Sequence, residues 1–387
     1  MAHSVAMSPE PTGQGDAVRL TQDGHDHMTA ALVLAARGLG RTWPNPAVGC
    51  VITRDGVVVG RGWTQPGGRP HAEVEALRRA GSAAYGATAY VTLEPCSHHG
   101  QTPPCADALA AAGVARVVAA LEDPDPRVSG RGVARLRKAG VAVQVGLGAE
   151  EATELNAGFF SRVRSGQPLV TVKAAASLDG RIATASGDSR WITGVRARML
   201  GHRLRAEHDA IAIGIGTALA DDPLLDCRIP GLEGRSPVRV VFDSQARLPP
   251  DGRLARSADR VPLWVLCTDA ADQARRDRLE SGGVRVLPVA GTADGRVDVR
   301  AALRALGGQG LTRLLVEGGG RLIGALLAAD AVDRLAWFSA PLLIGDRGRP
   351  AVAGFGLDRL ADCPDFAPLD RRVLGSDLMT LARRMPR

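Results

Sequence analysis

Aromatic residues, lysines and long apolar runs are scarce in this sequence. Aromatic residues make up 3 % of the 387 residues, and only two of the 48 basic residues are lysines. So few rings leave few platforms on which nucleic-acid bases could stack. No apolar run reaches the roughly 18 residues that a membrane-spanning helix needs, and the first 24 residues lack the apolar region of a secretory signal. The sequence therefore predicts a cytoplasmic protein with a loose tail at residues 1–24, which binds neither a membrane nor nucleic acid.

Cysteine is also scarce, and the charge is spread along the chain. Six cysteines in a chain of this length exclude a disulfide scaffold, and Cys96 and Cys105 stand in a context typical of metal ligands. The net charge of +7 comes from arginines interleaved with 41 acidic residues, which is typical of a solvated surface. Because arginine serves almost everywhere as the cation, Lys173 indicates a task that a guanidinium group cannot perform.

Apolar spacing alternates between helix and strand in two successive blocks. In the first block it predicts helices at 26–40, 72–80, 106–112 and 132–139, and strands at 48–52, 57–60, 87–93, 116–121 and 141–145. In the second block it predicts strands at 169–174, 210–215, 238–242, 263–267, 284–289, 313–316 and 335–340, and helices at 195–206 and 321–329. A mostly polar stretch, 150–167, separates the blocks. The sequence therefore predicts two α/β domains, at 25–166 and 167–387.

The strongest chemical signal combines His71, Cys96 and Cys105. One imidazole and two thiolates are the ligand set of a catalytic zinc that keeps its fourth position for water. Glu73 is not needed as a ligand and is predicted to act as general base toward the attacking water and then as general acid toward a leaving amine. The H-x-E pattern with two downstream cysteines is the signature of zinc deaminases, although eight residues separate the cysteines here where the signature has two.

The predicted elements place these residues favourably. Pro70 precedes a predicted helix, so His71 falls near the helix cap and Glu73 in the first turn, where the helix dipole tolerates an anion. Cys96 follows a predicted strand, and Cys105 opens the next helix, where a thiolate is stabilised.

Eight short motifs are distributed over both blocks. They are PNPAVGC at 44–50, PHAEV at 70–74, VTLEPCSHHG at 91–100, TPPC at 102–105, ASLDGR at 176–181, WITG at 191–194, LADDP at 219–223 and VEGG at 316–319. Together they closely resemble the riboflavin-biosynthesis bifunctional deaminase–reductase family. The TPPC segment that leads to the second cysteine is typical of that family and separates it from nucleoside and tRNA deaminases. Thr64 departs from the family pattern, in which histidine is common at this position, so the role of that side chain is open.

The resemblance implies two consecutive reactions. The first is zinc-dependent hydrolytic deamination of 2,5-diamino-6-(5-phosphoribosylamino)pyrimidin-4(3H)-one. The second is NADPH-dependent reduction of the ribosyl side chain to ribityl, which gives 5-amino-6-(5-phosphoribitylamino)uracil. The resemblance also implies an N-terminal cytidine-deaminase-like α/β/α sandwich and a C-terminal dihydrofolate-reductase-like α/β domain. The expected cofactors are one Zn²⁺ per chain and NADPH, the expected partner is a small phosphorylated pyrimidine, and a homo-oligomer is expected.

Residues of the second block offer parts of a dinucleotide site. No G-x-G-x-x-G follows the first strand, so a doubly wound Rossmann fold is not indicated. Three glycines, 318–320, stand instead between a strand that ends at Glu317 and a helix. There a pyrophosphate could approach backbone N–H groups, or the glycines could form a plain tight turn. Lys173 and Glu317 are predicted at strand ends facing this pocket, either as proton donor and ribose ligand or as a buried ion pair without a chemical role.

The resemblance further implies binding roles residue by residue. For NADPH it implies Ala175, Trp191, Thr217, Asp221, Ser244, Gly319, Gly320, Arg321, Leu322, Ile323, Gly324 and Ala325. For the substrate it implies Asn45, Ser189, Arg205, Leu225, Arg228 and Glu317. The guanidinium forks of Arg205 and Arg228 suit a phosphate group.

Two alternative functions remain at this point. One is a nucleic-acid or nucleoside deaminase with a C-terminal binding module, against which the missing basic–aromatic stripe and the cysteine spacing argue. The other is a non-enzymatic scaffold in which zinc is structural. A structural site needs a fourth protein ligand, which His98 or His99 could supply. These two histidines could equally contact substrate or be plain loop residues.

Overall fold

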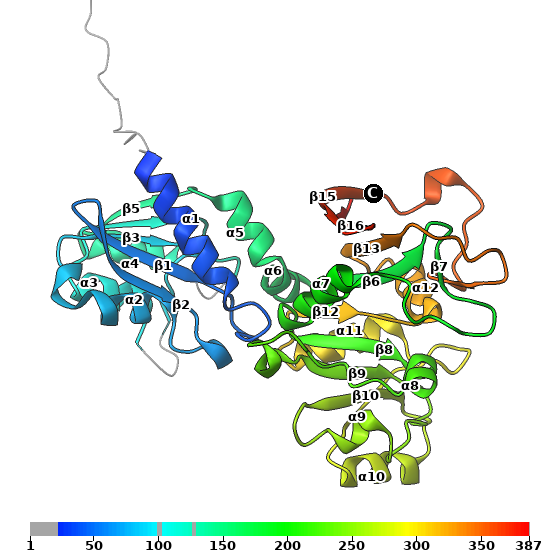
Figure 1. The fold of residues 1–387 in the computed structure, drawn as a ribbon. Helices are drawn as coiled ribbons and strands as arrows, with labels where there is room; N and C mark the ends of the chain where they lie inside the picture. The colour runs from blue at the N-terminus through cyan, green and yellow to red at the C-terminus, as the bar shows by residue number, and fades with distance from the viewer. Residues whose placement is uncertain (1–21, 99–102, 126–128, 387) are drawn as a thin grey trace, which may run out of the picture.

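The computed structural model describes residues 22–98, 103–125 and 129–386, and it holds two α/β domains joined by a pair of short helices (Figure 1). A five-stranded sheet in the order β2-β1-β3-β4-β5 forms the centre of the first domain. Its strands are β1 (Gly49–Arg54), β2 (Val57–Trp63), β3 (Thr88–Val91), β4 (Arg116–Ala119) and β5 (Ala142–Val145). β1 runs antiparallel to β2 and β3, whereas β3, β4 and β5 are parallel.

The β1–β2 hairpin follows from two residues. Asp55 and Gly56 both have positive φ, 51° and 76°. Positive φ at both central positions is the requirement of a type I′ turn, whose twist matches that of the flanking strands. The residues of β1 then alternate, so that Cys50 and Ile52 face one core and Val51 faces the other.

Helices cover both faces of this sheet. α2 (Ala72–Ala80), α3 (Cys105–Ala111) and α4 (Arg131–Lys138) pack on the face of Cys50, and α1 (Gln22–Ala36) and α5 (Ala149–Leu155) pack on the face of Val51. The predicted α/β/α sandwich is therefore confirmed. α1 ends at Ala36 rather than at the predicted residue 40, and the chain continues in turns up to residue 45.

A nine-stranded sheet in the order β11-β10-β9-β8-β12-β6-β13-β16-β15 forms the second domain. Its strands are β6 (Leu169–Ser177), β8 (Ala210–Gly214), β9 (Val238–Phe242), β10 (Leu263–Thr268), β11 (Arg285–Val289), β12 (Arg313–Val316), β13 (Arg334–Ala340), β15 (Phe366–Leu374) and β16 (Asp377–Arg384). The strands from β11 to β13 are parallel. The inner strands β8 and β10 are apolar and buried, as strands covered on both faces must be. A short ladder pairs β7 (Arg181–Ala183) with β14 (Arg349–Pro350).

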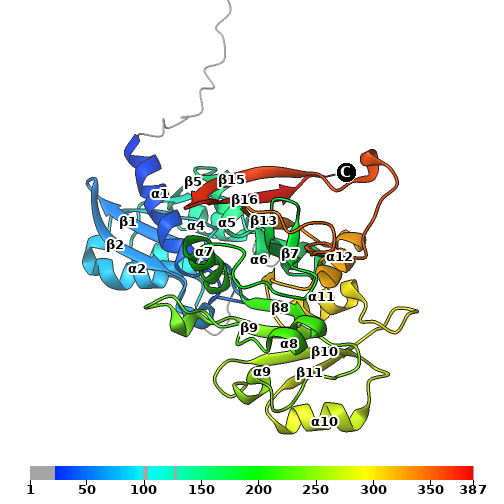
Figure 2. The ribbon, with the colours of Figure 1, turned by 45° about the vertical axis from the view of Figure 1, so that its right-hand side comes forward.

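The hairpin of β15 and β16 is missing from the sequence-based prediction. It extends the sheet antiparallel beyond β13, and Figure 2 shows it in red beside that strand. β15 is an edge strand in which Asp370, Arg371 and Arg372 follow one another. Such a polar edge lacks the apolar alternation by which strands are recognised in a sequence.

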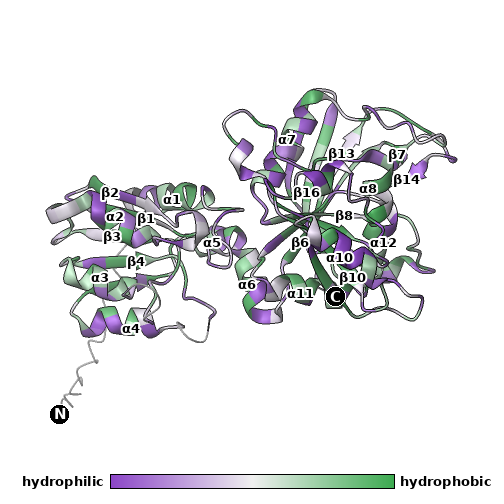
Figure 3. Cartoon of the chain, turned by 90° about the horizontal axis from the view of Figure 1, so that it is seen from below, coloured by the Kyte–Doolittle hydropathy of each residue, from purple (hydrophilic) through white to green (hydrophobic). Residues whose placement is uncertain are grey.

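Helices also cover both faces of the second sheet. α11 (Val299–Gly308) and α12 (Gly320–Ala328) pack on one face, and α8 (Ile215–Asp221), α9 (Arg253–Arg256) and α10 (Gln273–Ser281) pack on the other. α7 (Val195–Ala206) packs against β13 and β16. Figure 3 shows hydrophilic segments on α4 and α7, in keeping with an arginine-rich solvated surface. Four short 3₁₀ helices complete the described structure: Pro66–Gly68, Gly81–Ala84, Glu233–Arg235 and Leu360–Asp362.

α5 and α6 (Ala157–Ser165) connect the two sheets and fill the polar stretch between the predicted domains. Phe159 and Phe160 of α6 pack into the core of the first domain, while the Nε of Arg162 donates to the carbonyl of Gly307 in the second domain at 2.8 Å. The connection is therefore a packed pair of helices. Among the described residues, none of the helices has the length and apolar character needed to cross a bilayer.

Candidate functional site

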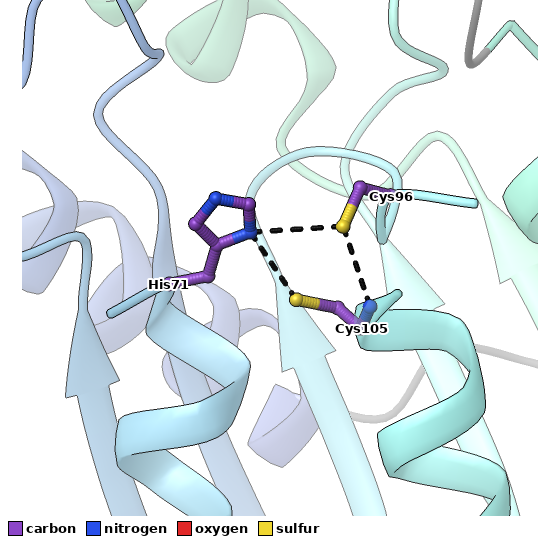
Figure 4. A group of neighbouring side chains, drawn as sticks. All are labelled: His71, Cys96 and Cys105. Carbon is purple, nitrogen blue, oxygen red and sulfur yellow. Dashed lines mark hydrogen bonds between the residues drawn. The ribbon is translucent and has the colours of Figure 1, made fainter. Parts of the chain in front are cut away.

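His71, Cys96 and Cys105 converge at the carboxyl ends of the first sheet's strands (Figure 4). His71 caps the start of α2, Cys105 is the first residue of α3, and Cys96 lies in the loop after β3. The Nδ1 atom of His71 lies 3.3 Å from the Sγ of Cys105 and 3.6 Å from the Sγ of Cys96. Zn–N and Zn–S bonds at a tetrahedral angle would separate such atoms by about 3.6 Å. The three side chains therefore fit one zinc ion.

The two thiols form a hydrogen-bonded pair. A hydrogen bond from Cys105 lowers the pKa of Cys96 to about 4. The backbone N–H of Cys105 also donates to the Sγ of Cys96, at 3.3 Å. The same interaction raises the pKa of Cys105, so of the two sulfur atoms Cys96 is the one favoured as a thiolate, which is the form that binds metal.

Glu73 lies beside this group without belonging to it. Its side chain sits in the first turn of α2 and the residue is only 3 % exposed. Burial raises the pKa of Glu73 to about 7, although His71 opposes this. A carboxyl group of this kind can both accept and donate a proton near neutral pH.

Glu94 is a further residue of this site, for which its motif predicted no role. Its carboxylate is buried and accepts four backbone hydrogen bonds: Oε1 from Gly132 (2.8 Å) and Val133 (3.1 Å), and Oε2 from Asp123 (3.1 Å) and Gly130 (2.9 Å). These bonds tie the loop before α4 to the segment that carries Cys96. The sequence signal that could have indicated this role was an acidic residue directly after the predicted strand 87–93 and two positions before a predicted metal ligand.

Asn45 and Thr64 make hydrogen bonds near the segment that leads to His71. The amide of Asn45 donates to the carbonyl of Gly68 at 3.4 Å, three residues before His71. The hydroxyl of Thr64 accepts from the N–H of Val48 at 3.0 Å and lies 3.4 Å from its carbonyl. Thr64 is buried, and through these bonds it links the residue after β2 to the residue before β1.

Gly67 and Gly68 give a matched pair of variants for testing Asn45. Both have positive φ, 77° and 83°, so alanine costs about 1–2 kcal/mol of backbone strain at either position. A Cβ at Gly68 would lie 2.0 Å from the Nδ2 of Asn45, whereas a Cβ at Gly67 would meet nothing within 4 Å. We expect Gly68→Ala to lower the kcat/KM of deamination by about tenfold to a hundredfold, and Gly67→Ala to leave it nearly unchanged. Equal losses in the two variants, measured by steady-state kinetics, would remove Asn45 from the site.

The two histidines of the loop do not join the cluster as far as the structure describes them. His98 is exposed and stands outside the group of potential metal ligands. His99 lies outside the described residues, so its predicted alternatives stay open.

A second group of charged side chains lies at the carboxyl edge of the parallel sheet. Glu317, directly after β12, is bound by both nitrogens of the Arg205 fork, with Nε–Oε1 at 2.6 Å and Nη2–Oε2 at 2.9 Å. The Nζ of Lys173 on β6 lies 3.7 Å from Oε2 of the same carboxylate. Burial opposes ionisation of Glu317, but Arg205 and Lys173 outweigh it and bring its pKa down to about 2.

Arg205 is therefore engaged by protein groups. Its remaining nitrogen, Nη1, donates to the carbonyl of Asp226 at 2.8 Å. The structure places it as the residue that orients Glu317, and its predicted contact with substrate stays a prediction. Arg228 is exposed, with its Nε 3.4 Å from the carboxylate of Asp226. Leu225 is buried, with a positive φ of 55°, and Ser189 lies in the connection before α7.

The residues predicted to bind NADPH fall into two groups, those at the carboxyl edge of the sheet and those that make structural contacts. Gly319, with φ 76°, stands where a Cβ would lie 3.1 Å from the Oγ1 of Thr217, so the glycine turn and α8 meet closely. Trp191 is exposed, and the guanidinium of Arg198 lies 4.5 Å from its ring centroid. Asp221 is exposed at the end of α8, and Ala175 lies near the end of β6. These residues lie at the carboxyl edge of the sheet, where open α/β sheets bind ligands.

The other predicted NADPH residues make structural contacts. A Cβ at Gly320 would lie 2.6 Å from the carbonyl of Pro350, and one at Gly324 would lie 2.0 Å from the carbonyl of Ala353, so both allow α12 to pack on that segment. The hydroxyl of Ser244 accepts from the N–H of Val297 at 3.0 Å. Four more predicted residues, Arg321, Leu322, Ile323 and Ala325, belong to α12, where Leu322 and Ile323 are buried in the core.

Fold and site together define a two-domain enzyme, a zinc-dependent deaminase of the cytidine-deaminase type joined to a reductase domain. Residues 21–121 match the family model described as the cytidine and deoxycytidylate deaminase zinc-binding region. Residues 168–378 match the model described as the RibD C-terminal domain.

Relatives match both domains at once. The riboflavin biosynthesis protein RibD of Escherichia coli K12 is 46 % identical over 363 residues, which cover 91 % of this chain and 97 % of that protein. The protein of that name from Bacillus amyloliquefaciens is 40 % identical, over 92 % and 95 % of the two chains. Among solved structures, RibD of Acinetobacter baumannii superposes with a TM-score of 0.85 at 38 % identity, over 95 % of this chain and 100 % of that one. The chain belongs to the RibD family of riboflavin biosynthesis proteins, which confirms the predicted family and both fold classes.

Proposed function

We propose that this chain catalyses both reactions implied by its sequence motifs. It deaminates 2,5-diamino-6-(5-phosphoribosylamino)pyrimidin-4(3H)-one and then reduces the ribosyl side chain of the product to ribityl with NADPH. A Thermotoga maritima protein of 34 % identity and TM-score 0.81, matched over 93 % of this chain and 98 % of its own, is described as a diaminohydroxyphosphoribosylaminopyrimidine deaminase and 5-amino-6-(5-phosphoribosylamino)uracil reductase. The observation that carries the proposal is the presence on one chain of the His71–Cys96–Cys105 group and the Lys173–Glu317 pair.

His71, Cys96 and Cys105 would hold the zinc ion of the deaminase site. When bound, zinc acts as a Lewis acid that makes water a nucleophile at neutral pH. Glu73, buried beside these ligands, accepts a proton from the attacking water and donates a proton to the departing amine. Water is consumed and ammonia is released, so Glu73 ends each cycle in the form in which it began. The Asn45 amide, on the loop next to Gly68, holds the substrate ring.

The reductase site is assigned to the carboxyl edge of the second sheet. NADPH supplies the hydride when bound. Lys173 carries its ammonium between Glu317 and the ring of Phe338, whose centroid lies 5.7 Å from the Nζ atom. There it donates a proton to the ribose ring oxygen as the ring opens, while Glu317, oriented by Arg205, accepts a hydrogen bond from a ribose hydroxyl. Arg228 is exposed, and we assign it to bind the substrate phosphate.

The proposal extends to the domains and the assembly. We assign deamination to residues 25–166 and reduction to residues 167–387. The predicted tail at 1–24 is corrected at its end, because residues 22–24 begin α1 of the first domain, and residues 1–21 lie outside the described residues. A cytoplasmic homo-oligomer is the expected state, with the phosphorylated pyrimidine as its small-molecule partner.

Mass spectrometry of the diaminopyrimidinone substrate after incubation with zinc-replete protein tests the proposal. We expect an amino group to be replaced by oxygen with or without NADPH, and two hydrogens to be gained only with NADPH. Deamination without reduction would overturn the roles given to Lys173 and Glu317. An unchanged substrate would overturn the proposed substrate altogether.

A further inference from the structure

The segment between α1 and β1, residues 37–48, belongs by sequence to the first domain but lies against the second (Figure 1). We call it the Asn45 loop. A Cβ at Gly40 would lie 2.6 Å from the carbonyl of Ala206 at the end of α7. The ring of Trp43 meets the ring of Trp264 edge-on, with the centroids 6.5 Å apart, and packs on the core of the second domain. The loop that carries a proposed substrate ligand of the deaminase is thus docked on the reductase domain.

Asn156, in the connection between α5 and α6, makes two hydrogen bonds to the backbone of this loop. Its Oδ1 accepts from the N–H of Ala47 at 2.9 Å, and its Nδ2 donates to the carbonyl of Ala47 at 3.0 Å. Both residues are buried, with 3 % and 4 % of their surfaces exposed. Buried backbone groups are costly when unpaired. The side chain of Asn156 supplies the partner for both polar groups of Ala47, two residues from Asn45.

The second domain in turn fixes the place of Asn156. The Nη2 of Arg313, at the start of β12, donates to the carbonyl of Leu155 at 2.6 Å and to that of Glu154 at 3.2 Å. The stem of Arg313 crosses α6 at Gly158, where a Cβ would lie 2.5 Å from its Cγ. A larger residue at 158 would push the arginine away. The carbonyl that immediately precedes Asn156 is therefore held by a strand of the reductase domain.

We infer that Asn156 is a positioning residue for deamination, and that the reductase domain sets its position through Arg313. Asn156 acts through the Asn45 loop and touches neither the metal ligands nor Glu73 by any hydrogen bond the structure describes. The inference rests on the proposed function in one respect, the assignment of Asn45 to the substrate. Its consequence is that the deaminase site is complete only when the two domains are packed together.

Steady-state deamination by the full-length Asn156→Ala variant tests the inference. Loss of a binding loop weakens ground state and transition state alike, so we expect KM to rise at least about tenfold with kcat within about threefold of wild type. Zinc content and reduction of the deaminated substrate should not change. A residue that merely stabilised the fold would instead reduce the active fraction, lowering kcat at constant KM, and that outcome would overturn the inference.

Two arginines of the second domain supply a matched pair for the other half of the inference. Arg334 also reaches Glu154, but it binds the carboxylate, with Nη2–Oε2 at 2.6 Å, and not the backbone. We expect Arg313→Lys to raise the KM of deamination and Arg334→Lys to leave it unchanged. An equal effect of both would show that Arg313 acts only through domain packing, contrary to the inference. This pair also carries the test if Asn156→Ala fails to fold.

Hydrogen exchange separates failure of this inference from failure of the proposed function. If wild-type protein does not deaminate the substrate, the proposed function is wrong, but the placement of the loop is still measurable. Peptides that cover residues 44–48 should exchange faster in Asn156→Ala, whereas peptides that cover α2 should not change. Unaltered exchange at 44–48 in a folded variant would overturn the inference.

Discussion

Replacing Glu73 by glutamine is expected to lower the kcat of deamination by about 10²–10⁴-fold, the usual contribution of a positioned general acid–base. Glutamine fills the same buried space but cannot accept a proton from water or pass one to the amine. Because Glu73 stands outside the ligand group, the variant should retain one zinc per chain. It should also reduce the deaminated substrate with NADPH at the wild-type rate. Deamination and reduction are measured separately, with each substrate supplied in turn.

Glu75 offers the control on the same helix. Its carboxylate pairs with Arg78 at 3.1 Å and with Arg79 at 3.5 Å, and its side chain is 12 % exposed. Glu75→Gln removes a charge of the same sign two residues away and should leave deamination within about twofold of wild type, because Glu75 stands outside the group of potential metal ligands and pairs with arginines instead. If Glu73→Gln kept wild-type deamination, or lost its zinc, the role given to Glu73 would be wrong.

Replacing Glu317 by glutamine is expected to reduce NADPH-dependent turnover by at least about 10²-fold, because Lys173 and the substrate hydroxyl lose the negative charge of their common partner. It should also destabilise the reductase domain. Arg205 and Lys173 would keep their charges without the carboxylate that compensates them, and breaking a buried ion pair in this way costs about 3–5 kcal/mol. A fall of about 10 °C in the melting temperature of that domain corresponds to such a loss. Deamination should be unaffected.

The stability difference between wild type and Glu317→Gln should depend on pH. The pKa of Glu317 lies at about 2 in the folded protein, below its ordinary value of 4.5. A depressed carboxyl pKa stabilises the fold fully above pH 4.5, and this contribution is lost as pH falls toward 2. The shift corresponds to about 3 kcal/mol. Thermal unfolding of both proteins at several pH values should therefore show the two melting temperatures approaching each other as the solution becomes more acidic than pH 4.5.

Glu207→Gln is the matched control for this variant. Glu207 pairs with Arg203 at 2.8 Å on the surface of α7, one helical turn from its partner. Its loss should change neither the melting temperature nor the reductase rate by a measurable amount. A pH-independent difference between wild type and Glu317→Gln would mean that the carboxylate is not the group that stabilises this edge of the sheet.

The sequence by itself determined the chemistry of the metal site and most of the fold. His71 and Glu73 lie at one helix start, and Cys96 follows a strand, so local structure alone aims them to one edge of the sheet. The buried parallel strands were predictable because they are short apolar runs between turn signals. The metal-ligand residues lie within 34 positions of one another, on successive elements of the chain, so their pattern can be recognised without a structure.

Other features were decided by the tertiary structure. The partner of Arg205 is Glu317, 112 positions later, so an arginine predicted to contact substrate also orients a carboxylate. Asn156 reaches Ala47 across 109 positions, and no local pattern marks either residue. The β15–β16 hairpin pairs at an edge where polar residues hide its alternation. Contacts of this kind depend on which surfaces the two packed domains bring together, and that information appears only once the chain has folded.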